Sequence, residues 1–228
     1  MEMRPRVVSI ALLAVLLSTP LCCVHAAAQT PSSAPPQQRP TSEPYTGDLS
    51  IFETPGRDQR LQINRVMDIL GIKNGKTVAD IGAGSGWFTV RAAKRVASKG
   101  LVYAVDINPE ATRYINERAQ REHLQNIRTI QSLPDDPLLP PGSVDAVLML
   151  KTYHEISHPV TLLRNFRAAL RPGATVGIID RNGNGENHGL DKDVVIREAK
   201  EAGYGLTGQY DFVKGDKMDY FLVFTAAQ

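Results

Sequence analysis

The sequence predicts an α/β fold with a mostly parallel, doubly wound sheet. From residue 77 onward, short apolar runs alternate with segments of helical periodicity, which is typical of a parallel sheet covered by helices. The first apolar run ends in an acid and three spaced glycines, as expected at a strand-to-helix turn. The two final segments, 204–213 and 218–224, have the spacing of a hairpin, so the C-terminal edge should be antiparallel.

The elements of the first half follow from periodicity and turn residues. A helix over 63–70 is indicated by apolar residues at i, i+3, i+4 and i+7, and Gly71 supplies its stop. Pro109 suits the first turn of a later helix. In order, we expect a strand at 77–81, a helix at 87–97, a strand at 101–106, the helix that starts at Pro109 and a short strand at 127–130.

The second half repeats the alternation. A connection rich in Pro and Asp leads to a strand at 144–150, and a loop over 151–159 then leads to a helix that carries Leu163 and Phe166. A strand at 175–179 and a helix at 194–202 precede the terminal hairpin. The predicted sheet therefore has seven strands.

Length and charge limit the functional classes. At 228 residues the chain is long enough for one domain with a substantial core. The formal charge of +2 is small and the basic residues are scattered, so we expect no nucleic-acid partner.

The first 28 residues have the pattern of a secretory signal peptide. Arg4 and Arg6 precede an apolar run over 7–17, Pro20 ends it, and small residues near Ala26 offer a cleavage site. The run is too short for a spanning helix, so no stable membrane insertion is expected after cleavage, and the protein should be periplasmic or secreted. An uncleaved membrane anchor is the alternative.

The segment that follows the signal has little to bury. Residues 29–50 are rich in Pro, Ser and Gln and are expected to form a disordered linker, with the folded domain over 51–228. Both cysteines, Cys22 and Cys23, lie inside the signal segment. Thiol and disulfide chemistry is therefore not expected in the mature protein.

The glycine loop is the most specific motif of the chain. It has the form Asp80-x-Gly82-x-Gly84-x-Gly86. A dinucleotide fingerprint, G-x-G-x-x-G, would need a third glycine at position 87, which is Trp87 here. The loop therefore departs from the dinucleotide pattern although it occupies the same strand–turn–helix context.

This loop resembles motif I of the class I S-adenosyl-L-methionine (SAM)-dependent methyltransferases, and three further segments extend the resemblance over residues 52–224. They are a strand that ends in an acid at 102–106, a "GSFD"-type strand at 141–150 and an "L-x-P-G-G"-type turn at 170–174. The resemblance implies a Rossmann-like seven-stranded sheet and SAM as the cofactor.

The resemblance also implies the cofactor-binding residues. The glycine loop would wrap the methionine half of SAM through Asp80, Gly82, Ala83, Gly84 and Gly86. Asp106, at the end of the second strand, would accept the ribose hydroxyls. Ile107 and Leu133 would flank the adenine, and Asp136, with its neighbour Asp135, would bind its polar edge.

Candidate catalytic groups lie where the fourth strand ends, at 151–155. His154 is a candidate base because histidine is the usual residue type for proton transfer near neutral pH, and Tyr153 is a candidate for orienting the substrate. The alternative is structural, with Tyr153 packing in the core and His154 capping the next helix.

The same loop contains a rival motif. Residues 154–158 satisfy H-E-x-x-H, the zinc-peptidase signature, but Pro159 disfavours helical geometry at His158.

A second metal-dependent alternative is the catechol type of methyltransferase, which has an acid at the end of the fourth strand and an Asp-Asn pair after the fifth. This chain has Lys151 at the first position and Asp180-Arg181-Asn182 at the second. We therefore expect no metal ligands.

The sequence thus predicts SAM-dependent methyl transfer to a small-molecule acceptor. A resemblance to predicted bacterial methyltransferases with a signal peptide rests on the segment 136–145 followed by Tyr153-His154. The alternative is a SAM- or nucleoside-binding protein without catalysis, and a zinc peptidase is the remote one.

Overall fold

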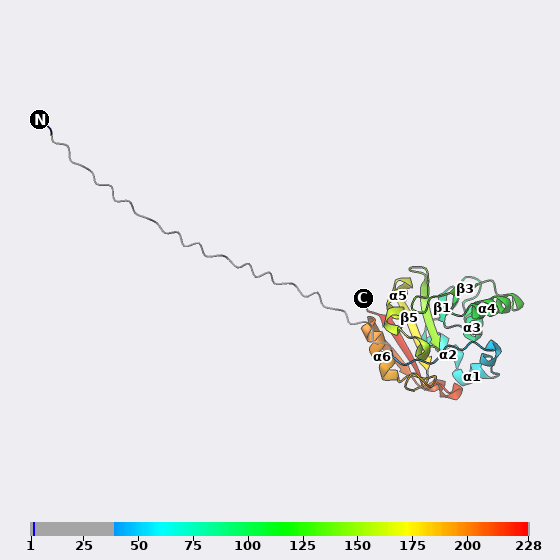
Figure 1. Cartoon of the computed structure of the whole chain (residues 1–228). Coiled ribbons are helices and arrows are strands. Elements are labelled where there is room, and N and C mark those ends of the chain that lie inside the picture. Colours follow the sequence, from blue (N-terminus) through cyan, green and yellow to red (C-terminus); the bar gives the residue numbers. More distant parts are fainter. Residues whose placement is uncertain (1, 3–38, 228) are drawn as a thin grey trace. The chain divides into compact units, whose positions relative to one another are not determined.

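A computed structural model describes residues 2 and 39–227 (Figure 1). The predicted signal peptide, apart from residue 2, and the part of the predicted linker over 29–38 lie outside the described residues. Within 39–227 the strands form one seven-stranded sheet in the order β3-β2-β1-β4-β5-β7-β6.

The strands of this sheet are β1 (Thr77–Ile81), β2 (Leu101–Asp106), β3 (Ile127–Gln131), β4 (Val144–Leu150), β5 (Leu170–Asp180), β6 (Tyr204–Tyr210) and β7 (Tyr220–Ala226). β1 to β5 pair in parallel, and β7 lies antiparallel between β5 and β6. The predicted Rossmann-like fold class is confirmed. β6 ends at Tyr210 instead of residue 213, and β7 begins at Tyr220 instead of residue 218, because Phe212–Asp216 form a 3-10 turn between them.

The α-helices are α1 (Arg57–Leu61), α2 (Ile63–Ile69), α3 (Trp87–Val96), α4 (Pro109–Arg121), α5 (Pro159–Phe166) and α6 (Lys192–Glu201). Side chains of α2, α3 and α4 share one buried apolar cluster with one face of the sheet, and those of α5 and α6 share a second cluster with the other face. Pro109 occupies the first turn of α4, and Asn108 caps that helix by accepting a hydrogen bond from the backbone of Glu110.

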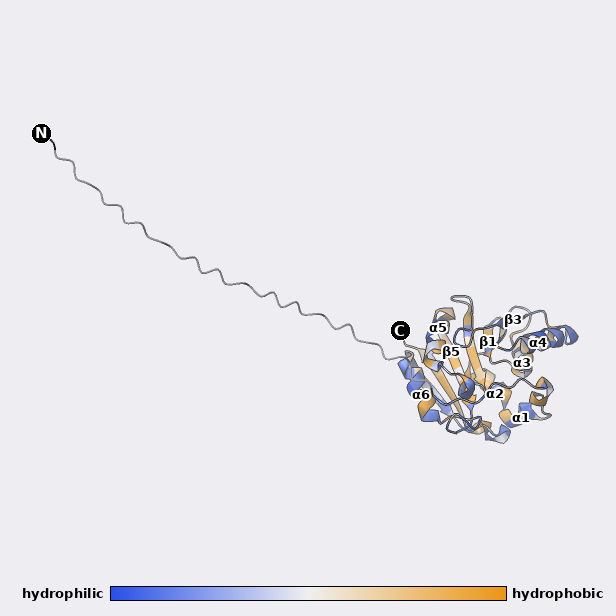
Figure 2. Cartoon of the chain, in the orientation of Figure 1, coloured by the Kyte–Doolittle hydropathy of each residue, from blue (hydrophilic) through white to orange (hydrophobic). Residues whose placement is uncertain are grey.

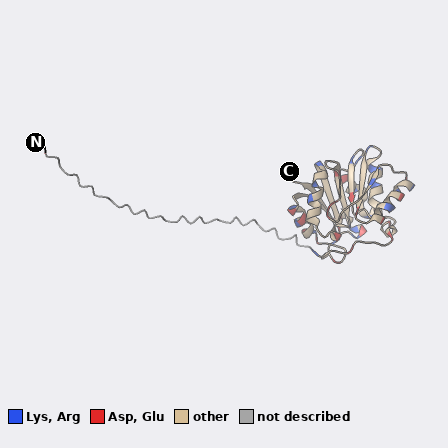
Figure 3. Ribbon diagram, turned by 45° about the horizontal axis from the view of Figure 1, so that its top comes forward, with Lys and Arg blue, Asp and Glu red and all other residues tan. Residues whose placement is uncertain are grey.

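The central strands are buried on both faces. Every residue of β1 is buried, and Val147, Leu148 and Met149 of β4 have no measurable exposure. Figure 2 shows the apolar residues concentrated in the strands, and Figure 3 shows charged residues on the surrounding helices. A parallel sheet covered on both faces needs such continuous apolar strands, so its polar groups gather where the strands end.

The sheet has a topological switch point between β1 and β4. The chain leaves β1 through α3 on one face and leaves β4 through α5 on the other. In open α/β sheets this arrangement leaves a crevice beyond the carboxyl ends of the strands, and ligands bind there.

The segment 39–50 differs from the predicted free linker. Ser42 and Leu49 are buried, and the Ser42 hydroxyl donates a hydrogen bond to the carbonyl of Gly185 at 2.9 Å. The guanidinium of Arg39 forms an ion pair with Glu198 at 2.9 Å. These residues therefore pack on the folded domain, because a few specific contacts compensate for a composition that has little to bury.

Among the described residues, no helix has both the length and the apolar character that a membrane crossing requires.

Candidate functional site

A cavity of about 960 Å³ lies beyond the carboxyl ends of β1, β2 and β4. Its walls are the loops that follow these strands and the N-terminal segment, residues 39–52, of which most residues from Thr41 to Phe52 line it. Of the predicted site residues, the lining includes Asp80, Gly82, Ala83, Gly84, Asp106, Ile107 and His154. The volume lies at the upper end of the range of small-molecule sites, about 300–1,000 Å³.

The three glycines of the loop after β1 serve different purposes. All have positive φ: 72° at Gly82, 54° at Gly84 and 72° at Gly86. A Cβ at Gly82 would collide with the side chain of Thr152, and one at Gly86 would lie 2.9 Å from Ile115. At Gly84 the nearest side chain, Phe52, is 3.7 Å away. Gly84 thus leaves its backbone open to the cavity. Gly86 is absent from the lining and is the N-cap residue of α3, so its predicted contact with the cofactor is corrected to a role in the turn.

Two polar side chains, Asp80 near the end of β1 and Ser85 in the glycine loop, are buried beside the cavity. Asp80 is 2% exposed and accepts a 2.6 Å hydrogen bond from the hydroxyl of Thr89. Burial raises the pKa of Asp80 to about 7, although the hydrogen bond from Thr89 opposes the shift. The hydroxyl of Ser85 is buried without a hydrogen-bond partner. A buried hydroxyl without a partner indicates a missing ligand or water.

Asp106 joins the loops after β1 and β2. One carboxylate oxygen accepts from the amide of Gly84 at 2.8 Å and the other from the amide of Asn108 at 2.9 Å. Burial raises the pKa of Asp106, against these hydrogen bonds. A carboxylate has about four acceptor positions, so two remain for a ligand.

The apolar residues near Asp106 lie as predicted, but Asp136 does not. Ile107 and Leu133 both line the cavity and are 42% and 53% exposed, which suits contacts with a flat ring. Asp136 is absent from the lining, and its carboxylate accepts from the amide of Leu138 at 2.9 Å. The predicted contact of Asp136 with the adenine is therefore corrected: its side chain stabilises its own turn.

The imidazole ring of His154 contacts the carboxylate of Asp180 on the Nδ1 side. His154 lies in a 3-10 turn, Tyr153–Glu155, and its Nδ1 is 2.9 and 2.8 Å from the two carboxylate oxygens of Asp180, the last residue of β5. Its Nε2 is buried and has no hydrogen-bond partner. The pairing with Asp180 orients the ring and leaves Nε2 available at the cavity.

Tyr153 does not reach the cavity. Its side chain has no measurable exposure, belongs to the apolar cluster under α5 and α6, and is absent from the lining. The guanidinium of Arg39 lies 5.5 Å from the centre of its ring and donates to its carbonyl at 2.7 Å. The predicted contact between Tyr153 and a substrate is corrected to a packing role.

The H-E-x-x-H motif does not form one helical face. The 3-10 turn ends at Glu155, and α5 begins at Pro159 with His158 as its cap. The zinc-peptidase geometry is therefore not present.

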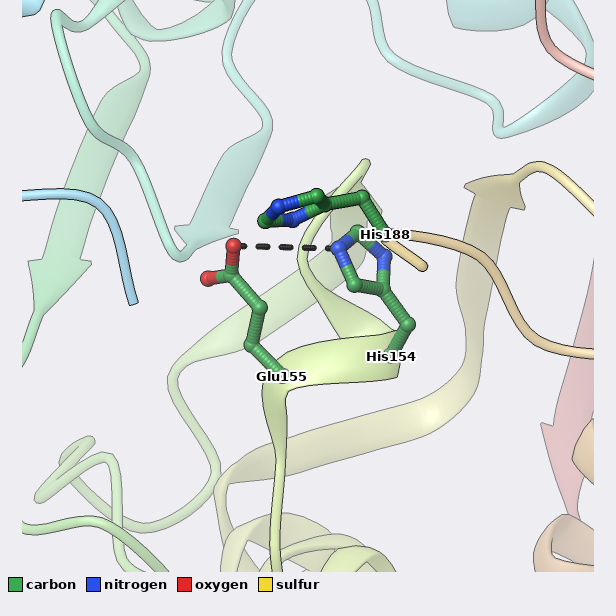
Figure 4. A group of neighbouring side chains, drawn as sticks. All are labelled: His154, Glu155 and His188. Carbon is green, nitrogen blue, oxygen red and sulfur yellow. Dashed lines mark ion pairs between the residues drawn. The ribbon is translucent and has the colours of Figure 1, made fainter. Parts of the chain in front are cut away.

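A different group of side chains surrounds His154. Glu155 and His188 approach it, and the ligand atoms of the three residues all lie within 4.8 Å of one another (Figure 4). Burial raises the pKa of Glu155 to about 7.

Several residues of the site were missed from the sequence. Ser85 lies between the predicted glycines, and His188 lies in a loop that composition alone marks as irregular. Asp180 carried the signal of an acid at a strand end, but its pairing with His154 joins positions 26 residues apart. Tyr45 and Phe52, whose rings pack edge to face at 5.3 Å, bring aromatic surface to the cavity.

Comparisons with known proteins agree with this geometry. Residues 78–173 match a family model described as a methyltransferase domain. A SAM-dependent methyltransferase from Aquifex aeolicus has a TM-score of 0.70 and 26% identity, over 78% of this chain and 98% of that one.

Curated relatives match a shorter region. The 2-phytyl-1,4-naphtoquinone methyltransferase of Trichormus variabilis is 31% identical over 111 residues, 48% of either chain. The ubiquinone biosynthesis O-methyltransferase of Xanthomonas campestris is 28% identical over 102 residues, 45% of this chain and 41% of that one. The chain thus spans about half the length of the curated relatives it matches.

The fold and the glycine-loop cavity are similar to those of SAM-dependent methyltransferases of known structure. The residues that match the methyltransferase-domain model, 78–173, lie inside the region 52–224 over which the sequence motifs resemble that family. The residues present fit SAM: Gly84 leaves space for the ligand, Ser85 offers an unpaired buried hydroxyl, and Asp80 and Asp106 are carboxylates beside the same cavity.

The buried carboxyl of Asp80 leads to a prediction about stability. Because its pKa is about 7 in the folded protein, against an ordinary value of 3.8, only the folded chain holds this proton between about pH 4 and about pH 7. The contribution of Asp80 to the free energy of unfolding should therefore fall as the pH rises through this window. It should level off above about pH 7, after a change of the order of a few kcal/mol.

Urea unfolding at several pH values measures this change, and Asp80→Asn is the matched variant because it has no proton to release. The variant should lose this part of the pH dependence and exceed the wild type in stability above about pH 7. Identical pH dependence in the two proteins would contradict the assignment.

Proposed function

We propose that this protein transfers a methyl group from SAM to a small-molecule acceptor. The observation that carries the proposal is that one cavity is lined by both the glycine loop and His154, whose Nε2 has no hydrogen-bond partner. When bound, SAM supplies an electrophilic methyl group on a sulfonium. The protein has to orient the acceptor, exclude water and, for an acceptor with a hydroxyl group, remove a proton.

Each of these tasks has residues available. Phe52 and Tyr45 in the N-terminal segment supply apolar surface over the glycine loop and limit access of water. In our proposal Nε2 of His154 removes the proton of the acceptor, and Asp180 stabilises the imidazolium that forms.

The acceptor that we favour is a small aromatic hydroxyl compound. The proposal is supported by the aromatic and apolar residues of the cavity wall and by a volume that can hold more than one small ligand. Two of the relatives are named as methyltransferases of a naphthoquinone and of ubiquinone biosynthesis. Hydroquinones and phenols are therefore the first acceptors to test.

A SAM- or nucleoside-binding protein without catalysis is the second candidate. The burial of Tyr153 favours it, because one of the two predicted catalytic side chains has a packing role. The position of His154 favours the enzyme, because this side chain lines the cavity. Turnover measurements separate the two candidates.

Cofactor binding can be tested by calorimetric titration of the full chain with S-adenosylhomocysteine. We expect binding, and we expect Asp106→Ala to weaken it by about 1–3 kcal/mol, the scale of lost hydrogen bonds to a charged group. Asp136→Ala is the matched control and should bind as the wild type does, since this side chain lies outside the cavity lining. A response to NAD alone, or equal losses in both variants, would contradict the proposed site.

The role of His154 can be tested with an acceptor from a screen of phenols and hydroquinones. His154→Ala should lower turnover by about 10²–10⁴-fold, the usual contribution of a general base, while affinity for S-adenosylhomocysteine stays nearly unchanged. His158→Ala controls for a nearby histidine at the start of α5. A parallel loss of turnover and cofactor affinity in His154→Ala would assign this residue a structural role.

We also propose that residues 1–28 direct export and are then removed, so that the enzyme acts in the periplasm or outside the cell. The support is the basic start, the short apolar run and the small residues near position 26. N-terminal sequencing of protein from a periplasmic fraction should begin at residue 27 or 29. Intact Met1 in a soluble fraction would overturn this proposal.

A further inference from the structure

Three metal-ligating side chains meet at one place in the cavity wall. His154, Glu155 and His188 each offer one ligand atom, and these atoms all lie within 4.8 Å of one another. The distance between Nε2 of His154 and Oε1 of Glu155 is 3.7 Å. We propose that these three residues bind a divalent transition-metal ion, with Zn²⁺ as its representative.

The donor set suits this class of ion. Two imidazoles and one carboxylate are the protein ligands of many catalytic zinc and non-haem iron sites, which leave further positions open. Ligand atoms at about 2.0–2.2 Å from one ion lie at most roughly 4 Å apart. The observed separations therefore need only small rotations, and His188, which is exposed, is free to make them.

The surroundings of His154 give an independent reason to expect a ligand at its Nε2. This nitrogen is buried without a hydrogen-bond partner, while Nδ1 is held by both oxygens of Asp180. A carboxylate behind a histidine is the usual outer contact of a metal-bound imidazole, since it fixes the ring and directs the free nitrogen to the ion. Figure 4 shows the side chains of Glu155 and His188 converging on this ring.

The cluster is distinct from the H-E-x-x-H motif. His158 is the cap of α5 and does not belong to the cluster, whereas His188 comes from the loop that follows β5. The ring centres of His154 and His188 lie 5.7 Å apart, nearly perpendicular to each other. All three ligands line the cavity, so an ion bound there has open coordination positions toward the space in which we place the acceptor.

This inference goes beyond the proposed methyl transfer and is measured separately from it. Nε2 of His154 cannot hold a metal ion and accept a proton at the same time. In the metal-bound protein, coordination to the ion would activate an acceptor oxygen, which is an established effect of such ions. Metal binding needs neither SAM nor an acceptor. A protein that binds no metal ion would therefore leave the methyl-transfer proposal intact.

Calorimetric titration of the full chain with Zn²⁺, after treatment with a chelator, tests the site. We expect one ion per chain, and at least a tenfold loss of affinity in His188→Ala and in Glu155→Gln. His158→Ala and His123→Ala are the matched controls and should bind as the wild type does. Asp180→Asn should weaken binding about 10–100-fold, as an outer partner of a metal ligand does.

Thermal unfolding without metal verifies that each variant is folded, and titration with S-adenosylhomocysteine shows that the cofactor site is intact. The absence of stoichiometric Zn²⁺ binding by the wild type would overturn the proposal. Wild-type affinity in both His188→Ala and Glu155→Gln would also overturn it, as would an equal loss in His158→Ala, because either result would locate the zinc elsewhere.

Discussion

The burial of the central strands on both faces is the constraint on which the rest of the structure depends. β1 and the middle of β4 are buried on both faces, so ionisable groups of these strands and their neighbours are confined to the ends. Asp80 lies next to the last residue of β1, Asp106 ends β2 and Asp180 ends β5. Three carboxyl groups thus lie at the carboxyl ends of the strands, and each accepts a short hydrogen bond from the chain.

These three acids support two parts of the cavity wall with different chemistry. Asp80 and Asp106 belong to the side of the glycine loop, where backbone amides and a buried hydroxyl can meet a polar ligand. Asp180 does not line the cavity, and it supports the other part of the wall by orienting His154. Both parts lie at the switch point between β1 and β4, where the two connections leave the sheet on opposite faces.

The sequence was sufficient for the fold and for one half of the site. Strand and helix patterns are local, and the glycine loop with its acids is encoded in nearby residues, so the positions of Asp80, Gly84 and Asp106 beside the cavity were predictable. His154 was identified as well, but its partners were not, because Asp180 and His188 reach it through tertiary contacts that no periodicity reports. Tyr153 and Asp136 were misplaced for a related reason: a loop sequence does not reveal which of its side chains turn inward.

The position of Arg39 has a consequence for how the cavity opens. Its guanidinium donates to the carbonyls of Tyr153 and His154, at 2.7 and 3.2 Å, and pairs with Glu198. The same stretch of chain continues into the residues that lie over the glycine loop. Moving this stretch away from the cavity would break the hydrogen bonds from Arg39 that stabilise the turn of His154. Arg39 therefore couples access to the cavity with the orientation of the His154 ring.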